Sequence, residues 1–135
     1  MKKIIFTEKA PAPIGPYSQA VLVGNTLYTS GQIAIEPSSG ELVLGTIEAE
    51  TKQVMENMKA VLAAADMGFD DVVKTTIFIT DMNDFARINA VYASYFGDGN
   101  APARETVQVS ALPKMVNVEI SMIASGQLQK FKSNS

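Results

Sequence analysis

The stretch Val72-Val-Lys-Thr-Thr-Ile-Phe-Ile-Thr80 decides the fold class, because it predicts a strand placed between two helical segments. Most of its residues are β-branched, and such side chains pack well on a pleated sheet. Before it, residues 46–67 carry apolar side chains at the three- and four-residue spacing of an amphipathic helix. After it, a second helix ending near Phe96 is predicted. Its apolar face consists of Phe85, Ile88, Tyr92 and Phe96.

Local signals mark the ends of both predicted helices. Thr46 can cap the first helix through its hydroxyl, and Asp81 or Asn83 can cap the second. Gly68 suits the left-handed conformation in which many helices end, so we expect the first helix to stop there.

Five further strands complete the pattern. Their predicted ranges are Lys3–Phe6, Ser18–Val23, Leu27–Ile35, Arg104–Val109 and Val116–Ala124. The turn Gly24-Asn-Thr26 predicts a hairpin between the second and third strands. The Pro-rich stretch 10–16 cannot be regular structure and forms a stiff loop that delivers Tyr17 to a defined place.

The element order β-β-β-α-β-α-β-β predicts a single-domain α+β fold, with both helices on one face of a six-stranded sheet. Such an arrangement leaves the other face of the sheet without a cover, so this face needs a partner. We expect residues 1–125 to form the domain and residues 126–135 to form a polar C-terminal tail.

Composition excludes several kinds of chemistry. The chain of 135 residues has 47% hydrophobic and 19% charged residues, which is typical of a globular domain. It contains no cysteine and no histidine, so disulfides, thiolate nucleophiles, imidazole catalysis and the common zinc sites are excluded. Its net charge of −3 argues against nucleic-acid binding. No apolar stretch is long enough to span a membrane, and we expect a cytoplasmic protein.

Phosphate and metal motifs are also missing from the sequence. The segment Gly97-Asp-Gly-Asn100 matches neither a Walker loop nor a dinucleotide fingerprint. The acidic pairs Asp70-Asp71 and Asp81 with Asp84 could contact Mg²⁺, but such pairs usually cap helices and face water. We therefore expect neither a metal site nor a phosphate-binding loop.

The last two strands carry the strongest candidate site. Each strand alternates polar and apolar residues, and pairing them as a hairpin around Ala111-Leu112 places Arg104 opposite Glu119. A guanidinium can hold a substrate carboxylate by two parallel hydrogen bonds, and a carboxylate beside it could polarise a water. A structural ion pair between the two strands is the alternative. In either case the arginine would lower the pKa of Glu119 and weaken it as a base.

Three other positions allow both a structural and a functional interpretation. Tyr17 is either a packed aromatic residue or a side chain presented by the Pro-rich loop. The pair Ser30-Gly31 indicates either a bulge or a close approach of a ligand or another chain to the backbone. Asn89 can bind a loop or contact a ligand.

These residues fall within motifs that strongly resemble the RidA/YjgF family. The matching motifs are Ile14-Gly-Pro-Tyr-Ser-Gln19, Leu27-Tyr-Thr-Ser-Gly-Gln-Ile33, Lys74-Thr-Thr-Ile-Phe-Ile79, Asn83-Asp-Phe85, Ala101-Pro-Ala-Arg104, Leu112-Pro-Lys114 and Val118-Glu-Ile120. They occur in the family's order and extend over residues 3–124, so the resemblance covers nearly the whole chain.

The resemblance implies a chorismate-mutase-like fold assembled as a homotrimer, with clefts between the subunits. It also implies hydrolysis of reactive imines and enamines, such as 2-aminoacrylate, to 2-keto acids and ammonia, without cofactor or metal. These substrates are intermediates of pyridoxal-phosphate dehydratases. A non-catalytic trimeric sensor of small keto acids or other carboxylates is the alternative. An RNA-directed nuclease, a description given to some relatives, conflicts with the charge balance and the missing histidine.

Residue roles also follow from the resemblance, position by position. Arg104 matches the arginine that binds the substrate carboxylate, and Glu119 matches the glutamate that positions the attacking water. The remaining cleft residues are Tyr17, Ser30, Gly31, Asn89 and Thr106, some of them contributed by a neighbouring subunit. Thr106 replaces a cysteine found in many members, so thiol chemistry is not available at this position.

Overall fold

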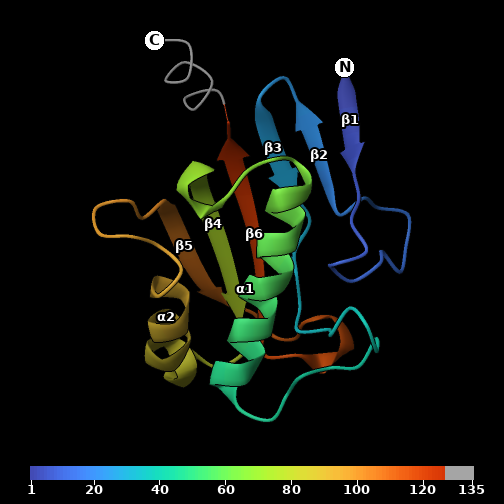
Figure 1. Cartoon of the computed structure of the whole chain (residues 1–135). Helices are drawn as coiled ribbons and strands as arrows, with labels where there is room; N and C mark the ends of the chain where they lie inside the picture. The colour runs from blue at the N-terminus through green and yellow to red at the C-terminus, as the bar shows by residue number, and fades with distance from the viewer. Residues whose placement is uncertain (127–135) are drawn as a thin grey trace.

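A computed structural model describes residues 1–126 of the chain and confirms the predicted order of elements (Figure 1). The strands are β1 (Lys2–Ile5), β2 (Ala20–Val23), β3 (Thr26–Thr29), β4 (Val72–Ile79), β5 (Ala103–Gln108) and β6 (Val118–Ser125). The helices are α1 (Ile47–Ala64) and α2 (Phe85–Ala93), with short 3-10 turns η1 (Phe69–Asp71), η2 (Met82–Asp84) and η3 (Pro113–Met115). Residues 127–135, which contain almost all of the predicted tail, lie outside the described residues. Among the described residues, no helix is long and apolar enough to cross a membrane.

The helix ends follow the predicted caps in part. The Thr46 hydroxyl accepts a hydrogen bond of 3.1 Å from the amide of Ala49, as expected. The left-handed residue at the end of α1 is Asp66 (φ 58°) rather than Gly68, whose backbone is extended. The expectation for Gly68 is therefore wrong, because the chain turns two residues earlier, where the amide of Met67 bonds back to the carbonyl of Leu62. Asp81 caps η2, which leads directly into α2.

The six strands form one sheet in the order β1-β2-β3-β6-β4-β5. Strand β6 pairs antiparallel with both β3 and β4, whereas β5 pairs parallel with β4 and lies at the edge. The predicted hairpin between β5 and β6 is therefore wrong. The crossover through α2 makes β4 and β5 parallel neighbours, and the long connection over η3 then carries the chain back to the other side of β4. Alternation along a strand reports which side chains share a face, not which strand lies beside it.

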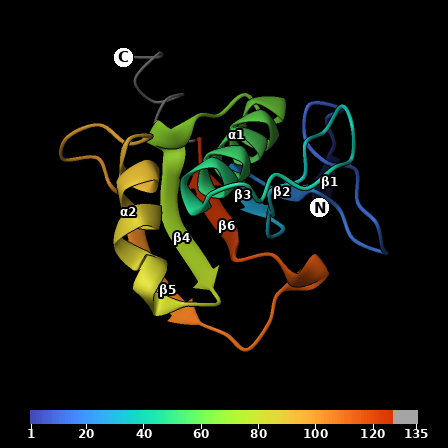
Figure 2. The same ribbon diagram turned by 90° about the horizontal axis from the view of Figure 1, so that it is seen from below.

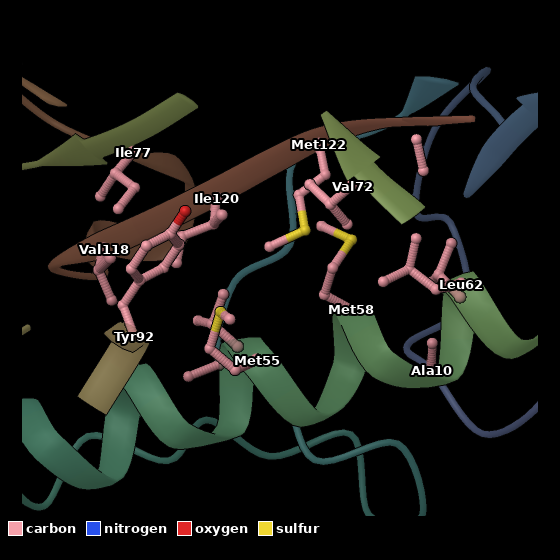
Figure 3. Packing of buried hydrophobic residues seen from close by; sticks show 14 of the residues in the cluster. Ala10, Met55, Met58, Leu62, Val72, Ile77, Tyr92, Val118, Ile120 and Met122 are labelled. Carbon is pink, nitrogen blue, oxygen red and sulfur yellow. The ribbon is translucent and has the colours of Figure 1, made fainter. Parts of the chain in front are cut away.

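Both helices cover one face of the sheet (Figure 2). On that face, alternate residues of β6 are buried against α1, and Figure 3 shows Met55 and Met58 among the side chains that pack toward Ile120 and Met122. Burying one such side chain contributes roughly 1.5–3 kcal/mol to stability. This layer holds the sheet, and hence the candidate site, in a fixed shape.

A buried carboxylate fixes α1 to the start of β6. Glu50 is 1% exposed and accepts hydrogen bonds from the amides of Asn117 and Val118, at 2.7 and 3.1 Å. It also accepts one of 2.8 Å from the side-chain amide of Asn117. These bonds satisfy a charge that would otherwise be costly to bury, and they locate the residue that follows, Glu119.

The second face of the sheet carries no helix, as predicted (Figure 2). We call it the open face. In the strand register it contains one row formed by Val107, Phe78 and Glu119, and another formed by Tyr28 and Ile123. Tyr28 and Val107 are 49% and 40% exposed. Exposed apolar side chains on a sheet face that no helix covers often mark an interaction surface.

Candidate active site

Arg104 lies on the helix-covered face, at the edge of the sheet beside α2. Its backbone pairs with Thr75 of β4, and its Nη1 atom donates a 2.6 Å hydrogen bond to Oδ1 of Asn89. No carboxylate of the described residues forms an ion pair with it. The other arginine, Arg87, differs because Glu48 binds it through two hydrogen bonds of 2.7 and 2.8 Å. Arg104 is thus the guanidinium that has free donors.

A pocket of about 520 Å³ opens beside Arg104. Asn89 and Tyr92 of α2 form one wall, and the loop that includes Asp98 and Pro102 forms another. We call it the Arg104 pocket. An organic anion entering it would meet a guanidinium that forms no ion pair with a described carboxylate and whose N–H donors suit a carboxylate.

Glu119 lies in a different pocket, of about 370 Å³, which we call the Glu119 pocket. Tyr17, Ser30 and Gly31 line it together with Glu119. Its remaining lining is largely apolar and includes Ile14, Ile33 and Pro113. The glycine is required here, because a Cβ atom at Gly31 would overlap with the carboxylate of Glu119. The group that lies closely over Gly31 is thus a side chain of β6 in the same chain, whereas the expected approach of a ligand or another chain stays a prediction.

Burial raises the pKa of the Glu119 carboxyl above its ordinary value. No arginine or lysine of the described residues lowers the pKa of Glu119, so the lowered pKa expected from a neighbouring arginine is wrong for the single subunit. A carboxylate with a raised pKa is a better acceptor of a proton from water than an ordinary one.

The predicted pairing of Arg104 with Glu119 does not exist within one subunit. The two side chains project from opposite faces, because Arg104 shares the face of Thr75 and Met122, whereas Glu119 pairs with Phe78 on the open face. The structural ion pair considered for them is excluded for the same reason. They line separate pockets with no residue in common.

The predicted site residues therefore form two groups. Tyr17, Ser30, Gly31 and Glu119 lie together in the Glu119 pocket, and Asn89 lies with Arg104 in the Arg104 pocket. Thr106 lies on the same face as Arg104, two residues further along β5, and lines neither pocket. Its buried hydroxyl has no hydrogen-bond partner among the described residues.

The Pro-rich loop holds Tyr17 at the rim of the Glu119 pocket. Tyr17 is 50% exposed, so it is presented to solvent and is not a packed core residue. Gln19, which is 1% exposed, anchors this loop by donating to the carbonyls of Thr7 and Pro11 at 3.0 and 2.9 Å. Ser30 is held in a similar way, since its hydroxyl donates to the carbonyl of Ser18 at 2.6 Å.

Sequence analysis missed two kinds of supporting residue. Gln19 stands inside the motif that follows the Pro-rich loop, where a side-chain amide is suited to binding the carbonyl groups of the loop. Phe85 and Tyr92 were assigned to the apolar face of α2, but their rings also contact Arg104. The spacing of Phe85, Asn89 and Tyr92 at i, i+4 and i+7 was the available signal, because it places all three on one side of the helix.

Residues 7–125 match the family model described as Endoribonuclease L-PSP. The chain belongs to this family. The match confirms the resemblance to the RidA/YjgF family found in the sequence. Among the described residues, no group of three potential ligands could hold a metal ion.

Relatives of known name cover nearly all of this RidA/YjgF chain. A RutC family protein of Pyrococcus horikoshii is 56% identical, with 92% of this chain and 98% of the relative covered. The 2-iminobutanoate/2-iminopropanoate deaminase of Rattus norvegicus is 52% identical, over 92% of this chain and 90% of the relative. The crystal structure of E. coli TdcF with bound serine superimposes with a TM-score of 0.86 at 45% identity, covering 91% of this chain and 98% of TdcF.

Proposed function

We propose that this protein hydrolyses short 2-imino acids, 2-iminobutanoate and 2-iminopropanoate, together with their enamine tautomers, to 2-keto acids and ammonia. The observation that carries the proposal is the combination of an arginine without a carboxylate partner and a partly buried glutamate with a raised pKa. Relatives of about half-identical sequence are named as deaminases of this kind, and the chain is an enzyme of the hydrolase class.

The residues divide the chemistry between binding and water activation. Arg104 holds the substrate carboxylate, and Glu119 accepts a hydrogen bond from a water placed near C2 of the imine. The water oxygen bonds to C2, the C=N π electrons move to nitrogen, and the proton removed from water passes through Glu119 to that nitrogen. The hydroxyl proton of the carbinolamine then passes to nitrogen, again through Glu119, the O–H electrons form the C=O bond, and the C–N bond breaks, which releases ammonia and leaves the 2-keto acid. Placing the water against an already electrophilic carbon is the main contribution of the enzyme.

This mechanism requires a second copy of the chain. Arg104 and Glu119 project from opposite faces of the sheet into separate pockets, so one subunit cannot present both to a substrate of three or four carbons. The proposal is a homotrimer in which each cleft combines the Glu119 pocket of one subunit with Arg104, Asn89 and Thr106 of its neighbour. The apolar residues of the open face support such an assembly, because they offer a surface for contact between copies.

The direct test is a coupled assay with a threonine dehydratase. We expect the protein to accelerate the release of 2-ketobutyrate from the dehydratase intermediate, in the absence of added metal or cofactor. A known imine deaminase in the same buffer is the positive control. Unchanged release beside an active control would refute the proposed function.

A non-catalytic sensor of small carboxylates is the second candidate. The uncompensated charge of Arg104 favours it, since this group alone would bind a keto acid, and the relative TdcF binds serine. Tight binding of 2-oxobutanoate in calorimetry, without any turnover of the imine, would favour the sensor over the enzyme. The cytoplasmic location inferred from the sequence stays a prediction.

A further inference from the structure

Two aromatic rings of α2 lie against the guanidinium of Arg104. Its Cζ atom lies 5.5 Å from the ring centre of Phe85 and 5.1 Å from that of Tyr92. Asn89, which accepts the hydrogen bond from Nη1, lies between them on the same side of the helix. We call Phe85 and Tyr92 the aromatic clamp.

The clamp orients Arg104 without cancelling its charge. Aromatic rings attract a guanidinium through their quadrupole, and Asn89 binds it through a neutral amide. Arg87 shows the alternative, because Glu48 and Asp84 hold it through carboxylates at 2.7 and 3.8 Å. A guanidinium held by carboxylates has little attraction left for a second anion, whereas one held by neutral groups keeps it.

The clamp is itself held firmly against the sheet. Tyr92 is 4% exposed, and its ring packs against Phe96 with 4.9 Å between ring centres. Figure 3 shows Tyr92 extending from α2 into the core beside Val118 and Ile120. The start of α2 is tied to the strand that carries Arg104, because Gln108 of β5 accepts a 2.8 Å hydrogen bond from the amide of Met82. This bond therefore helps to fix the position of α2 relative to the strand that carries Arg104.

We propose that Phe85 and Tyr92 are positioning residues, which hold Arg104 in the orientation that binds the substrate carboxylate. This inference rests on the proposed function, since it assumes that Arg104 takes the carboxylate. Because the rings and Asn89 hold the guanidinium from the side of α2, its remaining N–H donors are left for two parallel bonds to a carboxylate. The rings act through Arg104 and need not touch the substrate.

The test compares ring removal with ring conservation. Phe85→Leu and Tyr92→Leu remove one ring each, whereas Phe85→Tyr and Tyr92→Phe keep it. Tyr95→Leu is the matched control, because Tyr95 follows α2 closely and its ring packs against Phe69, at 5.3 Å, rather than against Arg104. For each variant, kcat and KM for the imine, the Kd for 2-oxobutanoate by calorimetry, and the melting temperature are measured.

We expect both leucine variants to raise KM and Kd by about 3- to 10-fold, the range of a cation–π contact, while kcat changes by less than about twofold. The ring-conserving variants should restore KM and Kd, and Tyr95→Leu should leave them unchanged even if it melts earlier. A merely structural role would instead reduce the folded fraction, which lowers the apparent kcat and leaves KM and Kd unaltered.

The outcomes separate this inference from the proposed function. If the wild type turns over the imine but both leucine variants keep its KM and Kd, the clamp is overturned and the deaminase stands. The same holds if Tyr95→Leu changes KM and Kd as much as the two leucine variants do. A wild-type protein that binds 2-oxobutanoate but does not turn over the imine would overturn the deaminase, and the Kd series would still decide on the clamp. A wild-type protein that does not bind 2-oxobutanoate would overturn the clamp as well.

Discussion

Arg104 and Glu119 lie on opposite faces of one sheet, and strand β4 separates the two strands that carry them. A reaction that uses both residues on one small substrate must therefore combine two copies of the chain. This relationship leads directly to a test in which defective subunits are mixed.

Mixing Arg104→Ala with Glu119→Gln subunits should restore activity that neither variant has alone. If each cleft takes its arginine and its glutamate from different subunits, random mixing at equal amounts leaves about one quarter of the clefts intact. Each variant alone has none. Co-refolding the two variants and measuring release of 2-ketobutyrate checks this prediction.

The double variant mixed with wild-type subunits provides the control for this experiment. It should retain about one quarter of the wild-type activity if clefts are shared, but about one half if each chain holds a complete site. No recovery in the first mixture together with one half in the second would contradict the shared cleft.

Replacing Arg104 should cost most of the activity even when the charge is kept. Arg104→Ala should lower kcat/KM by about 100-fold, because hydrogen bonds to charged groups contribute about 1.5–3 kcal/mol. Arg104→Lys should lose most of this as well, since an ammonium cannot form two parallel bonds to a carboxylate. Arg87→Lys is the control, because Arg87 is occupied by Glu48 on the exposed surface. Activity in Arg104→Lys close to that of the wild type would exclude bidentate binding.

The sequence predicted the elements of the fold but not the neighbours of every strand. Periodicity located α1, α2 and the six strands, because burial on one face imposes a period that side chains reveal. It could not show that β6 inserts between β3 and β4, since the polar alternation of β5 and β6 fits a hairpin equally well. The order of strands is decided by long-range packing, which leaves no local pattern.

The same limit explains what was missed in the candidate site. The residue types indicated that Arg104 binds a substrate carboxylate and that Glu119 positions a water molecule, and the family resemblance implied the same roles. Their separation into two pockets depends on strand order and was therefore not visible. The raised pKa of Glu119 also depends on it, because only the structure shows that burial, and not an adjacent arginine, acts on this carboxyl.

Glu50→Gln should destabilise the fold by about 1–3 kcal/mol, the cost of leaving buried donors without their acceptor. Oε2 of Glu50 accepts from the backbone amides of Asn117 and Val118, and Oε1 accepts from the side-chain NH₂ of Asn117, so a glutamine, which has one oxygen and one NH₂ group, places a donor against a donor at one of the two positions. Urea denaturation measures the change. Glu48→Gln, on the exposed side of α1, should shift the midpoint far less. Equal midpoints for the two variants would show that the buried bonds do not stabilise the fold.

The pH dependence of activity should reflect Glu119. Burial raises the pKa of its carboxyl above the ordinary value of 4.5, so on acidification this group becomes protonated at a higher pH than an exposed glutamate. The protonated form cannot accept a proton from water, and kcat/KM should therefore fall as the pH drops through the raised pKa. Glu119→Gln should be slow at every pH and should lack this acidic limb. An acidic limb that survives in Glu119→Gln would assign it to another group.

Gly31→Ala should reduce activity without unfolding the protein. A Cβ atom at Gly31 would overlap with the Glu119 carboxylate, so the glutamate has to leave its place over the glycine. Because the attacking water depends on that place, we expect kcat to fall by about 10- to 100-fold, the usual scale for losing a general base. Gly45→Ala is the matched control, since nothing lies within 4 Å of a Cβ atom there. Unchanged kcat in Gly31→Ala, with both variants folded by circular dichroism, would mean that the position of Glu119 does not matter for the reaction.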